Sequence, residues 1–154
     1  MVHRKLILRI DFDGYAALRA HAEEAYPNEC CGVLLGRFGD SENTVAGVVA
    51  CANARQDSPH NRYAIAPLDL IRIQRDARNQ GLEIIGFYHS HPDHPAQWSS
   101  TDLAEAHWLG CSYLIAHVAN GKATDTRSFR LLGAPEQSST DQKHFLEESI
   151  QISG

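Results

Sequence analysis

The sequence has no long hydrophobic run, few cysteines and no excess of basic charge, and each absence excludes a class of protein. Its 154 residues include four cysteines and no Cys-x-x-Cys pair, so a disulfide-stapled scaffold is not expected. We expect reduced, mostly buried thiols, although the sequence leaves a bridge between two of them open. The longest apolar runs have the length of β-strands and no signal-peptide core is present, which predicts a soluble cytoplasmic protein without a membrane partner. The net charge of -5 argues against nucleic-acid binding.

What the chain does contain is the composition of one ordinary globular domain. Hydrophobic residues make up 43% and charged residues 21%, so neither disorder nor a fibrous repeat is expected. A chain of this length buries roughly 70% of its unfolded surface when it folds. We therefore predict a single domain over residues 1–154, in which 134–154 form a loosely defined C-terminal extension.

The pattern of apolar residues alternates between strand-like and helix-like segments. Several of the expected strands are joined by hairpin turns, and helices are interspersed among them, which indicates a mixed α/β domain with a largely antiparallel sheet. Residues 145–152 fit an edge strand or a short helix. The predicted strands cover about 6–10, 31–35, 44–50, 63–65, 83–91, 111–118 and 124–132, and the predicted helices about 14–25, 68–80 and 99–109.

The most informative stretch is the predicted strand that ends in two histidines. Its residues before His89 are apolar and β-branched or aromatic, which is typical of a buried strand. Successive side chains of a strand point to opposite faces, so His89 and His91 share one face. Pro92 cannot donate a hydrogen bond to a sheet, and we expect the strand to end there.

A serine and an aspartate follow this strand at the start of a predicted helix. Ser99 and Asp102 have the spacing of a capping box, which places Asp102 in the first turn, where its carboxylate can point back at the histidines. Two imidazoles and one carboxylate suit Zn²⁺, and three protein ligands leave a fourth position for water. The sequence thus predicts one zinc ion per chain, held by His89, His91 and Asp102.

This spacing, His89-x-His91, seven residues and Ser99-x-x-Asp102, resembles the zinc motif of the JAMM/MPN (MPN+) metallopeptidases, in particular the small stand-alone bacterial type. All four fixed positions match. The one departure is Trp98, where small bacterial members often have proline. The resemblance implies the fold of that family, a curved central sheet flanked by helices and related to the cytidine-deaminase-like architecture.

The same resemblance assigns roles to residues and suggests a substrate. Glu29, just before Cys30 and Cys31 and an apolar strand, is similar to the family's general base, and Ser99 to the residue that stabilises the oxyanion. JAMM enzymes cleave bonds at the C-terminal tails of ubiquitin or ubiquitin-like proteins, and small bacterial members resemble processors of sulfur-carrier proteins. The resemblance therefore implies a zinc-dependent peptidase or isopeptidase that acts on such a tail.

Simpler explanations stay open at this point. A capping box alone explains Ser99 and Asp102, and paired histidines at a strand end can be satisfied by backbone hydrogen bonds. A cysteine protease using Cys30 or Cys31 would leave the His-x-His spacing unexplained. A non-catalytic MPN scaffold usually lacks a motif position, and none is missing here, while a RadC-like role in DNA repair is disfavoured by the acidic charge.

Overall fold

The structure, a computed structural model, describes residues 5–133 and 143–154, and these form seven strands and three helices. The mixed α/β class is as predicted. None of the described helices is long and apolar enough to cross a membrane. Along the chain the elements are β1 (Ile7–Asp11), α1 (Phe12–Ala25), β2 (Cys31–Phe38), β3 (Glu42–Cys51), α2 (Pro67–Asn79), β4 (Glu83–Pro92), α3 (Ser100–Glu105), β5 (Ser112–Ala119), β6 (Lys122–Leu132) and β7 (His144–Ser153).

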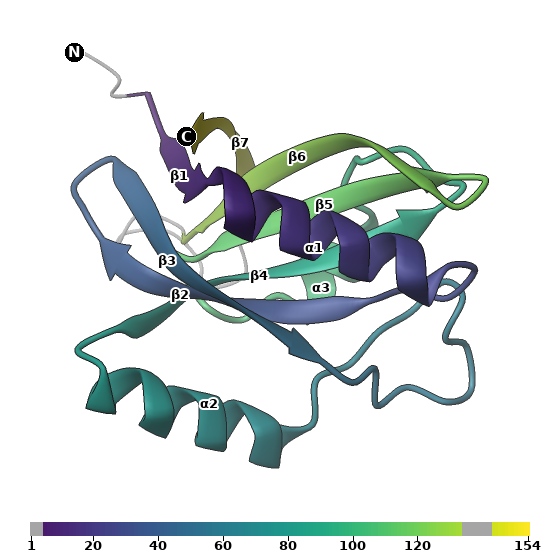
Figure 1. Ribbon diagram of the computed structural model, residues 1–154, viewed down its shortest axis with the longest axis horizontal. Coiled ribbons are helices and arrows are strands. Elements are labelled where there is room, and N and C mark those ends of the chain that lie inside the picture. Colours follow the sequence, from purple (N-terminus) through teal and green to yellow (C-terminus); the bar gives the residue numbers. More distant parts are fainter. Residues whose placement is uncertain (1–4, 134–142) are drawn as a thin grey trace.

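The seven described strands close into a barrel in the order β1-β3-β2-β4-β5-β6-β7 (Figure 1). The sequence predicted a curved, largely antiparallel sheet, and the sheet closes fully. Four of its neighbouring pairs are antiparallel, whereas β1 with β3, β1 with β7 and β4 with β5 are parallel. The parallel pairing of β4 with β5 arises because α3 lies between them in sequence and carries the chain back to the same end of the barrel.

The C-terminal strand completes the barrel. β7 pairs with β6 on one side and with β1 on the other, so residues 145–152 form a strand, as one of the two predictions had it, but not an edge strand. Of the predicted C-terminal extension, residues 134–142 lie outside the described part, while 144–153 form β7. The barrel seam, which we define as Ser128, Arg130 and Glu148, is buried where these strands meet. Arg130 Nη2 lies 2.6 Å from Glu148 Oε1 and also donates to the Ile7 carbonyl of β1 at 3.2 Å.

Two helices cover opposite faces of the sheet. α1 begins at Asp11, whose carboxylate accepts a hydrogen bond from the Gly14 amide at 2.7 Å, and buries Leu18 against Leu34 of β2. α2 packs on the other face, where Ala77 and Val33, the neighbour of Leu34 in β2, belong to one buried cluster. Figure 1 shows α1 across the front of the barrel and α2 beneath it. The alternation within β2 therefore determines which residues face each helix.

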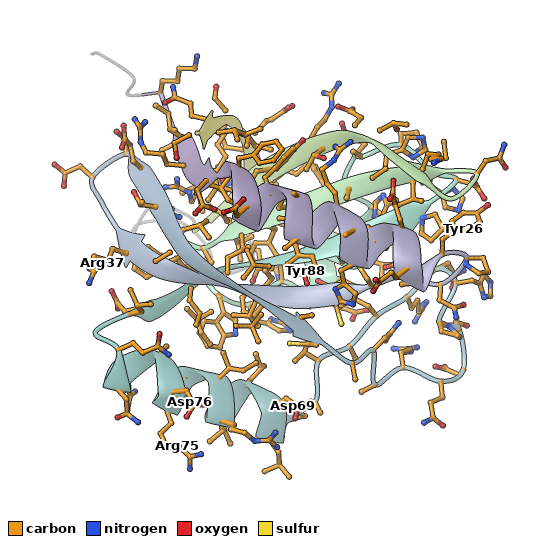
Figure 2. All side chains as sticks on the ribbon, in the orientation of Figure 1. Tyr26, Arg37, Asp69, Arg75, Asp76 and Tyr88 are labelled. Carbon is orange, nitrogen blue, oxygen red and sulfur yellow. The ribbon has the colours of Figure 1, made fainter. Side chains whose placement is uncertain are left out.

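Strand β4 has the same two-sided character. Tyr88 lies under α1, near the centre of the view in Figure 2, and its hydroxyl is 2.7 Å from His21 Nδ1. Phe87 belongs to the cluster on the α2 face. His89 and His91 share a face of β4 with Phe87, because they are separated from it by an even number of residues, so both histidines lie on the face away from α1.

Two predicted elements are corrected. Residues 63–65 are not a strand, because the Ala64 amide donates to the Asn53 side chain and the Ala64 carbonyl accepts from the Ala54 amide, all within one long connection. α3 ends at Glu105, well before residue 109, since Ala106 is already extended with φ -84° and ψ 123°. β4 ends at Pro92, where the strand was expected to end, and Pro92 still pairs with Val118 of β5.

Candidate metal centre

The two histidines of β4 lie on the same face of the sheet, as the alternation of strand side chains predicts. Their Nε2 atoms lie 3.2 Å apart, and both side chains are buried. Ser90, between them, faces the opposite way, and its Oγ accepts a hydrogen bond from the Cys30 amide at 2.8 Å. That bond ties the end of β4 to the residue that follows Glu29.

The first turn of α3 brings the carboxylate to the histidines. Ser99 Oγ accepts from the Asp102 amide at 3.0 Å, and Asp102 Oδ2 accepts from the Ser99 amide at 2.9 Å, which is a complete capping box. The same carboxylate lies 3.3 Å from His89 Nε2 through Oδ1 and 3.2 Å from His91 Nε2 through Oδ2. The capping box and the cluster with the histidines are therefore both present, and one does not exclude the other.

Hydrogen bonds direct the nitrogen lone pair of His91 towards the cluster. Its Nδ1 lies 2.8 Å from the carbonyl oxygen of Pro95, which can only accept, so Nδ1 carries a proton and Nε2 of the neutral ring is free to act as a ligand. His89 lies deeper, and the ring of Tyr63 stacks on it with centroids 4.5 Å apart and an interplanar angle of 20°.

The pKa values of the three groups are shifted by burial and by one another. Burial lowers the pKa of His89. Burial also acts against charge on His91, but its hydrogen bonds with Asp102 and the Pro95 carbonyl outweigh that effect and raise its pKa. Burial opposes ionisation of Asp102 too, yet its close contacts with the two imidazoles hold its pKa well below the usual range. The surroundings of Asp102 therefore favour its ionised form.

These three side chains fit a divalent metal ion. Among the described residues, His89, His91 and Asp102 offer ligand atoms that all lie within 4.8 Å of one another. Their two imidazole nitrogens and one carboxylate oxygen form a donor set that zinc accepts in open sites. The fixed tautomer of His91 adds the orientation that a ligand needs.

Glu29 lies at the entrance of β2, beside the same cluster. Its side chain is only 6% exposed, and burial raises its pKa to about 8. Glu29, His91, Ser99 and Asp102 line one cavity of about 400 Å³. The structure therefore brings together four of the five predicted residues at the cavity wall, with His89 directly behind them.

Other residues singled out by the sequence have simpler surroundings. His94 lines the cavity, and Trp98 packs against Phe145 with ring centroids 5.6 Å apart. Burial raises the pKa of the Cys30 thiol to about 11 and that of Cys31 to about 12, which keeps both protonated and argues against a cysteine nucleophile. All four cysteines are free, as expected of reduced thiols.

Sequence reasoning missed Tyr63 and Asn53. Tyr63 was assigned to a short strand, and nothing in its pattern indicated that its ring covers His89. Asn53 lies between the predicted strands at 44–50 and 63–65, where an asparagine is ordinary. The one available signal was its position, because an asparagine near the start of a long connection after a strand can organise that connection with its side-chain amide.

Fold and site together define a class: a mixed α/β barrel domain with a His-His-Asp group that can hold a metal ion beside a buried glutamate. The chain belongs to the family described as prokaryotic homologs of the JAB domain, whose profile matches residues 13–132. This confirms the resemblance to JAMM/MPN proteins that the motif indicated.

Two relatives of known name support the same family. The chain is 34% identical over 113 residues to a desampylase from Haloferax volcanii. The aligned region covers 70% of this chain and 78% of that relative. It is also 34% identical over 90 residues to a probable TtuB-protein conjugate cleaving protease from Thermus thermophilus, covering 58% of this chain and 57% of that protein.

Solved structures show the same fold. A protein from Desulfitobacterium hafniense superposes with a TM-score of 0.77 at 28% identity, over 95% of this chain and 92% of that one. A protein from Salinibacter ruber superposes with a TM-score of 0.65 at 34% identity, over 92% and 90% of the two chains. The fold is therefore shared along nearly the whole chain.

Proposed function

We propose that this protein is a zinc-dependent isopeptidase that hydrolyses a bond at the C-terminal tail of a ubiquitin-like, sulfur-carrier type of protein. The observation that carries the proposal is the convergence of His89, His91 and Asp102 beside Glu29 at one cavity. The names of the two relatives, a desampylase and a conjugate cleaving protease, support a conjugate as the substrate.

The metal would be held by His89, His91 and Asp102, one ion per chain. When bound, Zn²⁺ supplies a Lewis acid that polarises a carbonyl group. Asp102 contributes the negative charge and holds both imidazoles through its two oxygens. His91 is oriented by the Pro95 carbonyl, so this part of the site is rigid before any substrate arrives.

Glu29 is the proposed general base. Its pKa of about 8, raised by burial, lies close to the neutral range in which a carboxyl group can both accept and release a proton. It takes a proton from the attacking water and delivers it to the leaving amine. Because Glu29 is buried, few other solvent molecules compete for that proton.

Ser99 is the proposed oxyanion donor. Its oxygen already accepts the Asp102 amide hydrogen, which positions the hydroxyl and leaves the hydroxyl proton for another acceptor. A fixed donor at this wall of the cavity stabilises negative charge as it develops on the carbonyl oxygen of the substrate. The predicted cytoplasmic location and the absence of nucleic-acid and membrane partners complete this proposal.

Hydrolysis of a defined fusion tests the function. The protein is incubated with a ubiquitin-like sulfur-carrier protein fused through its Gly-Gly end to a reporter, with metal content measured in parallel. We expect release of the reporter that a chelator abolishes, that Zn²⁺ restores and that iodoacetamide leaves intact. Stoichiometric zinc without any cleavage would favour an MPN scaffold, and cleavage that persists in chelator would overturn the metal assignment.

A further inference from the structure

The long connection from β3 to α2, residues 52–66, is organised by one amide side chain. Asn53 Nδ2 donates to the carbonyl oxygen of Glu29 at 3.3 Å and to that of Arg62 at 3.0 Å. Asn53 Oδ1 accepts from the amides of Arg55 at 3.0 Å and Ala64 at 3.1 Å. An asparagine side chain has two donors and two acceptor lone pairs, so this amide is fully used.

These bonds reach the candidate metal centre from two directions. Arg62 and Ala64 flank Tyr63, whose ring stacks on His89, so the amide holds the backbone on both sides of that ring. Glu29 is held through its carbonyl by Asn53, while its own amide donates to the Pro59 carbonyl of the same connection at 2.7 Å. The Asn53 side chain therefore links Glu29, the proposed base, to Tyr63, whose ring stacks on His89.

The position of the Glu29 carboxyl depends on this backbone support. Within residues 5–133 and 143–154, no hydrogen bond or ion pair is found for the Glu29 carboxyl oxygens, in contrast to Asp102. A carboxyl without a partner takes its direction from its backbone and from packing. A displacement of about 1 Å in a catalytic group can cost on the order of 10²-fold in rate.

We propose that Asn53 is a positioning residue of this site, which sets the Glu29 carboxyl relative to His89 through the connection that also carries Tyr63. Within the described part of the chain, the Asn53 side chain has no hydrogen bond to His89, His91 or Asp102, and its four bonds all go to backbone groups. The proposal rests on the proposed function for its kinetic consequence, whereas its structural consequence can be measured without any activity.

The test compares Asn53→Ala with Gln56→Ala, which shortens an exposed amide in the same connection. We expect Asn53→Ala to lower kcat by about 10- to 100-fold, with KM and zinc content unchanged, because the substrate and metal contacts stay intact. Gln56→Ala should match the wild type. A loss confined to KM, a loss of zinc, or an equal effect of Gln56→Ala would overturn the proposal.

Asn53→Asp removes the donor half of the side chain and keeps its acceptor half. It also keeps the test informative if Asn53→Ala does not fold. The aspartate keeps an acceptor for Arg55 and Ala64 but loses both donors to Glu29 and Arg62, and it adds charge beside two carbonyl oxygens. We expect kcat to fall as in Asn53→Ala, while the Ala64 amide stays protected from hydrogen exchange. Wild-type kcat in Asn53→Asp would overturn the role of the bond to Glu29.

Hydrogen exchange of the folded protein tests the clamp directly. In Asn53→Ala the amides of Arg55, Ala64 and Glu29 should exchange faster than in the wild type. Arg55 and Ala64 lose their hydrogen bond to the Asn53 side chain, and Glu29 bonds to Pro59 in the connection that this side chain orders. Unchanged exchange would overturn the proposal even if catalysis were impaired. If the wild type cleaves no fusion at all, the proposed function fails, and the exchange result still decides whether Asn53 organises this connection.

Discussion

Two buried glutamates, Glu148 in the barrel seam and Glu29 at the candidate metal centre, differ in whether their oxygens have partners. Glu148 Oε1 accepts from Arg130 Nε at 3.0 Å and from Nη2 at 2.6 Å, and its Oε2 accepts from Ser128 Oγ at 2.7 Å. For Glu29, the described residues provide no partner to the carboxyl, and burial raises its pKa to about 8.

The difference shows how burial is used for two purposes in one small domain. A buried carboxylate whose two oxygens both have hydrogen-bond donors joins three strands of a barrel. A buried carboxyl without partners is held near its point of ionisation, which costs stability but suits proton transfer. The first arrangement belongs to folding and the second to chemistry, and substitutions can separate them.

The largest expected effect comes from removing the proton-transfer group. Glu29→Gln should lower kcat by about 10²- to 10⁴-fold, because an amide of similar shape cannot take up the proton. Zinc content, measured by metal analysis, should stay at the wild-type level. The control is Glu24→Gln, an exposed acid near the end of α1, which should cleave normally. Wild-type turnover in Glu29→Gln would place the base elsewhere.

The matching substitution at the barrel seam should act on stability instead. Glu148→Gln leaves the buried Arg130 without its counter-charge, and breaking such a pair costs about 3–5 kcal/mol. Denaturant unfolding measures the loss, and the fraction that remains folded should keep its kcat. Glu147→Gln is the control, because its ion pair with Arg127 is exposed and worth under about 1 kcal/mol. Equal effects at the two positions would remove the distinction.

Ser99→Ala distinguishes a helix cap from a catalytic donor. As an oxyanion donor, Ser99 should account for about 10²- to 10³-fold in kcat. As a cap, its loss costs only about 1 kcal/mol of stability. We expect both effects together, with zinc content retained, and Ser100→Ala should change neither by much. Full activity in a slightly less stable Ser99→Ala protein would reduce Ser99 to a cap.

The smallest expected effect is a stabilisation that depends on pH. The pKa of Glu29 rises from an ordinary 4.5 to about 8 in the folded protein, so ionisation works against folding. In the metal-free wild type, the contribution of Glu29 to the free energy of unfolding is complete below pH 4.5 and is lost as the pH rises towards 8. Metal-free Glu29→Gln lacks this loss, and its melting temperature should exceed that of the wild type by a few degrees at pH 8.

The two melting temperatures should converge below pH 4.5, where the wild-type carboxyl becomes protonated in both states. Glu24→Gln serves again as the control and should follow the wild type across the whole range. A gap between wild type and Glu29→Gln that does not vary with pH would mean that the two proteins differ in packing, not in the ionisation of Glu29.

The parts of the site that the sequence predicted are those that depend on local geometry. His89 and His91 share a face because strand side chains alternate, and Asp102 follows Ser99 at a capping-box distance. Both features lie within a few residues along the chain. Glu29 is different, since only its resemblance to a family motif indicated a role, and no local pattern places it beside the histidines.

By itself, the sequence determined the class of fold, the positions of most helices and strands, and the set of residues that can hold a metal ion. Hydrophobic periodicity and helix capping act over short separations, so they are visible in the chain. Closure of the barrel by β7, the cover of Tyr63 over His89 and the clamp of Asn53 on Glu29 were decided by tertiary structure alone. These contacts join residues that are distant in the chain, and their energies depend on burial and on hydrogen-bond partners that exist only after the barrel has closed.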